Sequence, residues 1–281
     1  MDVTFWGVRG SIPSPGPATV RYGGNTSCVA VRLANQELVV LDCGTGARNL
    51  GLQLLTGPFG QGQGRATFLL SHAHWDHIQG FPFFGPFYVA GNAFTIYGGG
   101  LGSLEAILEG QMAAQYFPVQ TIKNMGAQIE MRAVIPDQPF EVAGAAVRAH
   151  ANPHGPTPAF AFRIDDAGRV LAYASDAGYG QDGPSGEAIA LCQGADLLIH
   201  DSTFTPEDRA LRIARGLSSL EDAVECAVRA GVKRLALFHY DQDYSDHQVD
   251  QLVVRGRRLL DERGATGIEI VGAAEGLTLT L

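Results

Sequence analysis

The sequence predicts an α/β protein in which mixed β-sheets are covered by helices on their outer sides. Short apolar runs rich in Val, Ile, Leu and Phe recur along the 281 residues and are typical of strands. Three segments with helical periodicity lie among them. Because the strands cluster early and return at the C-terminal end, the order is not a strict βαβ repeat. We therefore expect mixed sheets rather than one parallel sheet.

The predicted strands are the apolar runs themselves, taken in chain order. They cover residues 3–8, 27–33, 37–42, 66–71, 94–97, 160–164, 170–175, 196–200 and 234–239. The C-terminal segment GIEIVGAAEGLTLTL is also strand-like.

The predicted helices cover residues 101–115, 218–230 and 246–262. Ser219 followed by Asp222, or Ser218 followed by Glu221, provides a capped start for the second helix. The chain shows no linker, low-complexity tract or internal repeat. We therefore expect one domain over residues 1–281.

Composition and charge exclude several classes of function. The net charge of −9 argues against a general polyanion binder, because nucleic-acid binding normally needs a concentrated basic face; a small phosphate substrate is still compatible with it. The four cysteines are far apart, so neither a disulfide framework nor a thiolate zinc site is expected. The N-terminus lacks a signal-peptide pattern, and no stretch approaches the roughly 20 apolar residues that span a bilayer. We expect a cytoplasmic protein that makes no membrane contact.

The segment SHAHWDHIQG concentrates four potential metal ligands, His72, His74, Asp76 and His77. An extended chain would place residues 72, 74 and 76 on one face, whereas a helix would align only 72 and 76. Neither brings all four groups to one point, but a strand that ends at Ser71 and breaks into a loop would divide them between two neighbouring ions. Imidazole and carboxylate suit zinc, and also manganese or iron. The alternative is a histidine-rich surface turn.

HxHxDH after a strand resembles the defining motif of the metallo-β-lactamase superfamily. That resemblance implies an αββα four-layer sandwich, with two mixed β-sheets between helices on both outer faces. Three further segments are similar to superfamily motifs: LDCGTGARNLG at 41–51, YASDAG at 173–178 and LFHYDQDYSD at 237–246. The opening FWGVRGSIPSPG and the YGGNTSCVAV that follows resemble the branch containing RNase Z and cyclic-nucleotide phosphodiesterases.

The resemblance implies two divalent ions per chain, zinc or manganese, with iron as a further option. The first would be held by His72, His74 and a histidine from HANPHGPTPAFAFRI. Two histidines lie in that segment, and His154 is favoured over His150 because Gly and a short loop into a strand follow it. His150 would then be a core histidine or lie behind the ligands.

The second ion would be held by Asp76, His77 and His239, with Asp176 bridging both ions. Asp42 is expected to organise the turn and the metal ligands from behind rather than to bind metal directly. HxHxDH retains a histidine where the oxygen-reducing diiron branch of the superfamily has a glutamate. This favours hydrolysis over redox chemistry.

DLLIHDSTF, at 196–204, resembles the His-Glu-Ala-Thr motif of the RNase Z and phosphodiesterase branch, with Asp in place of Glu. The resemblance implies that His200 protonates the departing alkoxide and that Asp201 orients it. Such a group contributes about 10²–10⁴-fold to a rate. The alternative is that His200 only caps a strand.

Three residues are candidates for substrate contact. Phe81 and Phe84, in GFPFFGPFYVAG, would stack a nucleobase, although core packing or a dimer contact explains them equally well. Arg9, in the Gly- and Pro-rich N-terminal loop, would contact phosphate, with a surface role as the alternative.

The resemblance therefore implies a binuclear metal-dependent phosphodiesterase acting on a small phosphodiester such as a cyclic nucleotide. Metal-bound hydroxide would be the nucleophile, and Asp76 and His200 would take part in catalysis. A tRNA 3′-processing endonuclease is less favoured, because only residues 155–175 separate His154 from Asp176, where bacterial RNase Z carries its basic arm. Two further hypotheses are a carboxyl-ester or lactone hydrolase on the same site and a non-catalytic metal-binding protein. We expect no extended nucleic-acid surface, and a homodimer is common in the resembling families.

Overall fold

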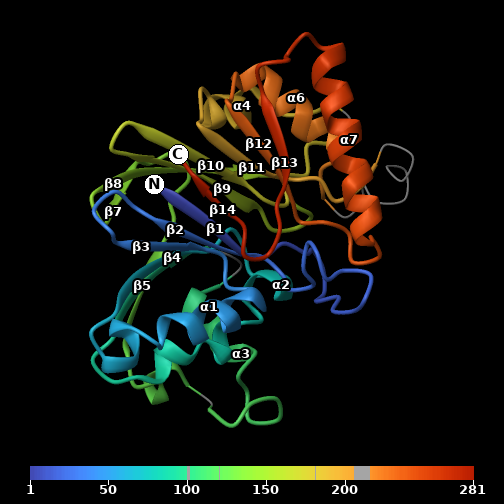
Figure 1. Ribbon diagram of the computed structural model, residues 1–281. Helices are drawn as coiled ribbons and strands as arrows, with labels where there is room; N and C mark the ends of the chain where they lie inside the picture. The colour runs from blue at the N-terminus through green and yellow to red at the C-terminus, as the bar shows by residue number, and fades with distance from the viewer. Residues whose placement is uncertain (100–101, 120, 181, 206–215) are drawn as a thin grey trace.

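The computed structural model describes residues 1–99, 102–119, 121–180, 182–205 and 216–281. Within these residues the chain forms two seven-stranded β-sheets packed face to face, with helices on both outer sides (Figure 1). The predicted four-layer α/β sandwich with two mixed sheets is confirmed. No helix in the described ranges is long and apolar enough to cross a bilayer.

The first sheet has the chain's N- and C-terminal strands side by side at one edge. Its spatial order is β14 (Thr278–Thr280), β1 (Asp2–Gly7), β2 (Cys28–Arg32), β3 (Leu38–Leu41), β4 (Arg65–Leu69), β5 (Ala93–Gly98) and β6 (Gln128–Ala133). Strands β1 to β3 pair antiparallel, and β3 to β6 pair parallel.

The second sheet follows the same plan. Its spatial order is β13 (Glu269–Gly272), β12 (Arg234–Phe238), β11 (Leu197–Asp201), β10 (Arg169–Ala174), β9 (Ala159–Asp166), β8 (Ala145–Asn152) and β7 (Phe140–Val142). Strands β10 to β13 pair parallel, whereas β7 to β10 pair antiparallel.

Helices cover the outer face of each sheet (Figure 1). Helices α1 (Gly46–Leu54) and α3 (Leu104–Gly110) lie on the first sheet, and α4 (Gly186–Cys192), α6 (Leu220–Ala230) and α7 (Asp246–Glu262) lie on the second. The short helix α2 (Trp75–Ile78) begins just after the first two histidines of the motif. Short 3₁₀ turns cover Pro58–Gln61, Phe81–Phe83, Gly85–Tyr88 and Ile122–Asn124.

Strand β3 shows why the central strands appear as continuous apolar runs. Val39 and Leu41 join the core between the sheets, whereas Leu38 and Val40 join the core on the outer side of the first sheet. Because successive side chains point to opposite faces and both faces are covered, every position is apolar. The four cysteines are free and buried in these cores.

The predicted strands are present, with ends that differ by a few residues. The prediction missed β6, β7 and β8; β8 alternates buried and exposed side chains, so its polar half hides the apolar pattern. It also missed α1, α2 and α4, which are short.

The three predicted helices are all present, but with different accuracy. The range 246–262 coincides with α7, and α6 begins with the Ser219–Asp222 capping box. Helix α3 is shorter than the predicted 101–115, and residue 101 lies outside the described residues.

The parallel strands of the two sheets end at one edge of the sandwich. Asp42 follows β3, Asp176 follows β10 and His239 follows β12. All three have left-handed backbone, with φ of 59°, 54° and 56°. A non-glycine residue held this way costs about 1–3 kcal/mol and is concentrated at functional sites. This edge is therefore the first place to seek a site.

Candidate metal centre

Three histidines from different segments form the first group of donors. His72 and His74 follow β4, and His154 follows β8. Their ring centroids lie 4.5–4.7 Å apart, and His154 Nε2 lies 2.9 Å from His74 Nδ1. One ligand atom from each lies within 4.8 Å of the others, which is close enough to share one ion.

Asp76, His77, Asp176 and His239 form the second group, and all four are buried. Asp176 Oδ2 lies 2.6 Å from His77 Nε2, and His239 Nε2 lies 3.0 Å from Asp76 Oδ2. The two imidazole Nε2 atoms of His77 and His239 are 3.3 Å apart. Two carboxylates and two imidazoles thus point at one place.

Asp176 joins the two groups. Its Oδ2 lies 3.5 Å from His72 Nε2, and its Oδ1 lies 3.3 Å from His239 Nε2. Asp176 therefore lies between the two groups, and the bridging role that the family resemblance implied for it stays a prediction. His154, and not His150, lies with the first group; His150 lies on β8 and pairs with Asp137.

Hydrogen bonds behind the histidines orient their lone pairs toward the centre. Asp42 Oδ2 lies 2.7 Å from His77 Nδ1, and the Gly216 carbonyl lies 2.6 Å from His154 Nδ1. Because a carboxylate or carbonyl oxygen only accepts, each Nδ1 carries the proton and donates it. In the neutral imidazole the Nε2 lone pair is then available to a metal.

Asp42 is the main support of this arrangement. Its buried carboxylate accepts hydrogen bonds from Ser71 N at 2.7 Å, Ser71 Oγ at 2.8 Å and Tyr173 OH at 2.6 Å, besides that from His77. Ser71 Oγ also lies 3.1 Å from His72 Nδ1. Asp42 therefore contacts the histidines from behind and belongs to neither donor group.

The electrostatics of the two groups differ. Burial lowers the pKa of His72 and of His74, with further lowering from neighbouring histidines, which keeps both imidazoles neutral. Burial also acts to lower the pKa of His77, but the carboxylates of Asp76, Asp42 and Asp176 raise it well above its usual range. A metal entering the second group therefore displaces a proton.

The donor set fits a divalent cation. Among the described residues, His72 Nε2 and both carboxylate oxygens of Asp176 are buried, and their short contacts with neighbouring donors do not have hydrogen-bond geometry. Buried polar atoms normally have partners, so these converging nitrogen and oxygen atoms are suited to bind a divalent cation. Imidazole and carboxylate suit zinc, manganese or iron.

Both groups open into one cavity of about 490 Å³. Ser11, Ala73, Trp75 and Leu217 complete its lining. The Ser11 backbone N–H donates to Asp76 Oδ2 at 2.7 Å, so the N-terminal loop contacts a candidate ligand. None of these four lining residues was predicted from the sequence. Trp75 could have been, because it is a large apolar residue between two candidate ligands, His74 and Asp76.

Comparison with known proteins places this geometry in a family. A model of the Beta-lactamase superfamily domain matches residues 38–240. The chain belongs to the metallo-β-lactamase superfamily. Ribonuclease Z from Synechococcus sp. (strain CC9311) is 29% identical over 293 residues, which cover 87% of this chain and 89% of that protein.

Solved structures of the superfamily share the fold. The metallo-beta-lactamase fold protein YhfI from Bacillus subtilis has a TM-score of 0.70 at 21% identity, covering 99% of this chain and 98% of its own. The short form of human tRNase Z has a TM-score of 0.67 at 22% identity, covering 100% of this chain and 99% of its own. The predicted metal-dependent hydrolase of the RNase Z and phosphodiesterase branch is confirmed at this level.

The structure contradicts the role predicted for His200 from the superfamily motif. His200 is fully buried and is not among the described residues that line the cavity. Its Nδ1 lies 2.8 Å from the Asp201 carbonyl, and its Nε2 lies 2.9 Å from Tyr179 OH. Burial acts to lower its pKa, but hydrogen bonds with Asp201 and Cys226 raise it to about 10. His200 is a buried structural residue, not a proton donor to substrate.

Asp201 is likewise structural. Its carboxylate is fully buried, accepts hydrogen bonds from Ser218 N at 2.8 Å and Ala177 N at 3.4 Å, and lies 3.3 Å from His200 Nδ1. It ties the loop after β10 to the start of α6. The predicted contact between Asp201 and His200 is present, but it lies inside the fold and orients a histidine that does not line the cavity.

The predicted substrate contacts are also wrong. Phe81 and Phe84 are 1% and 0% exposed and pack in the core beneath α1. Arg9 is fully buried and donates to the carbonyls of Gly23, Asp241 and Tyr244. Arg9 thus holds the loop after His239 instead of contacting phosphate.

Proposed function

We infer that this chain is a binuclear metal-dependent phosphodiesterase acting on small phosphodiesters. The observation that carries this proposal is the pair of donor groups joined at Asp176 within one cavity. Two divalent ions at such a site supply Lewis acidity, which offsets charge on phosphoryl oxygens and acidifies water. The names of the curated relatives support a phosphodiester over a carboxyl ester.

Each donor group would bind one of the two ions. His72, His74 and His154 would hold one ion. Asp76, His77 and His239 would hold the other, with Asp176 between the two. The remaining lining residues, Ser11, Ala73, Trp75 and Leu217, would contact the part of the substrate beyond the phosphoryl group.

A proton donor for the leaving group is not supplied by the described part of the lining. The ionisable groups that line the cavity there all belong to the two donor groups. Without a protein acid, a leaving oxygen must depart as an anion or take its proton from water. We therefore expect turnover to favour leaving groups of low pKa, such as nitrophenolate.

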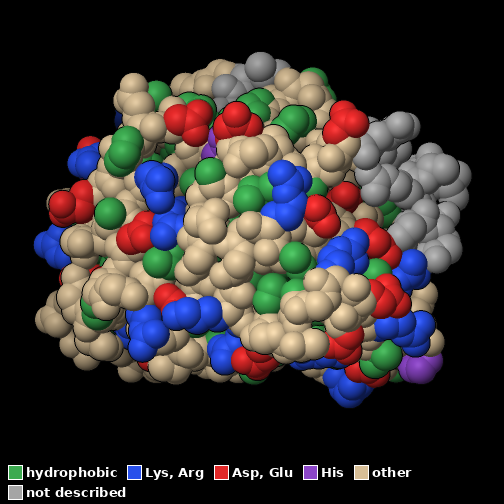
Figure 2. Space-filling model, turned by 90° about the horizontal axis from the view of Figure 1, so that it is seen from above, with side chains coloured by type: hydrophobic (Ala, Val, Ile, Leu, Met, Phe, Trp, Pro, Cys, Tyr) green, Lys and Arg blue, Asp and Glu red, His purple; other side chains and the backbone are tan. Residues whose placement is uncertain are grey.

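A tRNA 3′-processing activity is the second candidate, because the curated relatives are named ribonuclease Z. Three observations favour small substrates instead. The net charge is −9, and no Lys or Arg is among the described residues that line the cavity. On the face seen in Figure 2, basic and acidic side chains are interspersed, without a continuous basic field.

The test is a substrate screen with the metal-loaded protein. Bis(4-nitrophenyl) phosphate, cyclic nucleotides, a precursor tRNA and lactones would be compared, with His72→Ala as the inactive control. We expect turnover of the small phosphodiesters and its loss in His72→Ala. Turnover of lactones alone would overturn the proposal, and a preference for precursor tRNA would establish the second candidate.

A further inference from the structure

Trp75 is the most exposed large aromatic side chain that lines the cavity, at 70% exposure. It is the first residue of α2 and lies between His74 and Asp76. Asp76, His77 and Ile78 of the same helix are buried, so the turn that directs the ligands inward leaves the indole outside. A tryptophan in water forgoes a large hydrophobic gain, and the fold does not use this one for packing.

Apart from Ser11 and the candidate metal ligands, the described residues that line the cavity with Trp75 are apolar. Ala73 and Leu217 line the same cavity, and none of its described lining residues is Lys or Arg. A second phosphate or a polyanionic chain would find no charged partner on this wall. A substrate with a flat, uncharged ring next to its phosphoryl group could stack that ring on the Trp75 indole.

We propose that Trp75 is the platform on which an aromatic ring of the substrate stacks, either a nucleobase or an aryl ester. This inference rests on the proposed function and narrows its substrates to phosphodiesters that carry a planar ring. It also moves the stacking role away from Phe81 and Phe84, which are buried. The ring is held by the same turn that directs Asp76 at the ions, so binding and chemistry share one rigid element.

The first test is direct binding, measured by fluorescence. The chain has two tryptophans, so Trp6→Phe leaves Trp75 as the single indole. Adenosine monophosphate, phenyl phosphate and ribose 5-phosphate are titrated into this variant with metals bound. We expect adenosine monophosphate and phenyl phosphate to quench the Trp75 fluorescence and ribose 5-phosphate to leave it unchanged. The tighter of the two ring ligands shows whether the platform prefers a nucleobase or an aryl ester. Equal responses to all three, or none, would overturn the proposal.

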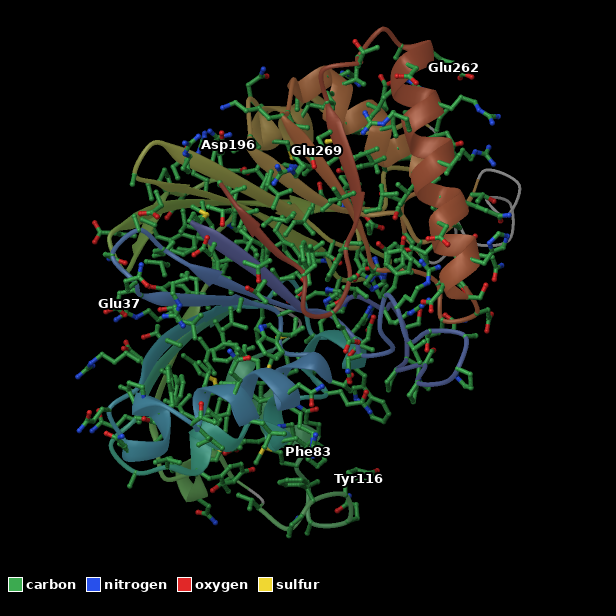
Figure 3. The ribbon with its side chains drawn as sticks, viewed as in Figure 1. Glu37, Phe83, Tyr116, Asp196, Glu262 and Glu269 are labelled. Atoms are coloured by element: carbon green, nitrogen blue, oxygen red, sulfur yellow. The ribbon has the colours of Figure 1, made fainter. Side chains whose placement is uncertain are left out.

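The second test is kinetic, with matched variants. Removing a stacking residue costs about 5- to 150-fold in affinity, so Trp75→Ala should lower kcat/KM for a ring-bearing phosphodiester by that factor. Trp75→Phe should keep most of the activity. Tyr116→Ala is the control, because Tyr116 is 72% exposed but is not a lining residue and lies on the lower side of the molecule with Phe83 (Figure 3).

The two tests separate this inference from the proposed function. If no phosphodiester is turned over but the ring ligands quench Trp75, the proposed function fails and the platform stands. If turnover occurs and Trp75→Ala stays within twofold of the parent protein, the platform fails alone. Metal content is measured in every variant, and a loss of metal in Trp75→Ala would assign its effect to the neighbouring ligands and overturn the proposal.

Discussion

Asp42→Asn is the most informative substitution at this site, because it changes charge and hydrogen bonding with almost no change in shape. Asparagine tolerates the left-handed backbone that Asp42 adopts at φ 59°. If the side-chain carbonyl keeps the bond to Ser71 N, the new amide nitrogen faces Ser71 Oγ, Tyr173 OH and His77 Nδ1. The tyrosine hydroxyl can rotate to accept. His77 loses its acceptor, and to accept from the new amide it must carry its proton on Nε2, the nitrogen that faces Asp176 and His239.

The expected magnitude follows from these contacts. Loss of a partner behind a metal-binding histidine costs about 10- to 100-fold in metal affinity. Hydrogen bonds to a buried charged group contribute about 1.5–3 kcal/mol each, so we also expect a loss of about that size in the free energy of unfolding. The second group, which contains His77, should be affected more than the first.

The assay is metal titration by calorimetry, paired with urea unfolding of the metal-free protein. Asp222→Asn is the matched control, because Asp222 is a mostly buried aspartate in the capping box of α6 that belongs to neither donor group and does not line the cavity. It should cost about 1 kcal/mol of stability and leave metal affinity unchanged. If Asp42→Asn remained folded and bound metal within twofold of the parent protein, the orienting role argued for Asp42 would be refuted.

Three further outcomes are expected. In Gly10→Ala the new Cβ would lie 2.3 Å from His239 Cε1, so the ring must shift, and activity should fall by about 10²-fold for a displacement of about 1 Å; Gly16→Ala, which meets nothing within 4 Å, should be neutral. Chelation should lower the melting temperature, since ions present at about 100 times their Kd contribute about 2.7 kcal/mol, and calorimetry showing no change would contradict this. The pKa of His200 is raised from 6.5 to about 10 and that of Cys226 is lowered from 9.0 to about 5. The unfolded chain therefore holds one more proton between pH 5 and 6.5, and the folded chain one more between pH 9 and 10. Stability should rise by about 2 kcal/mol over the lower range, stay level, and fall above pH 9; Cys226→Ser should remove the rise in urea unfolding.

The metal motif could be predicted from sequence because its chemistry is local. Four ligand-type side chains follow one strand, and neither a strand nor a helix aligns them, so two ions were the simplest solution. Asp176 and His239 came from resemblance alone, because only the folded sheets bring them to the motif.

The errors share one physical cause, which is that sequence does not tell whether a side chain at a strand end or in a turn faces the cavity or the core. β11 lies between two parallel strands, so His200 and Asp201 are both buried although they alternate. Phe81 and Phe84 lie in tight turns that fold beneath α1. Trp75 is the opposite case, a large aromatic residue that is exposed. The buried side chains of Asp76, His77 and Ile78 take the inward-facing positions of the same short helix.

The division of the site between two sheets has a consequence for how activity can change. The first sheet carries the histidine motif, and the second carries His154, Asp176 and His239. The layer of side chains between the sheets sets how far apart these halves stand, for example where Phe5 meets Phe238 with ring centroids 6.2 Å apart. Because a misplacement of about 1 Å can cost about 10²-fold in rate, the thickness of this layer sets the spacing of the reacting groups. Adaptation to a new substrate can therefore begin at buried apolar positions that never touch it.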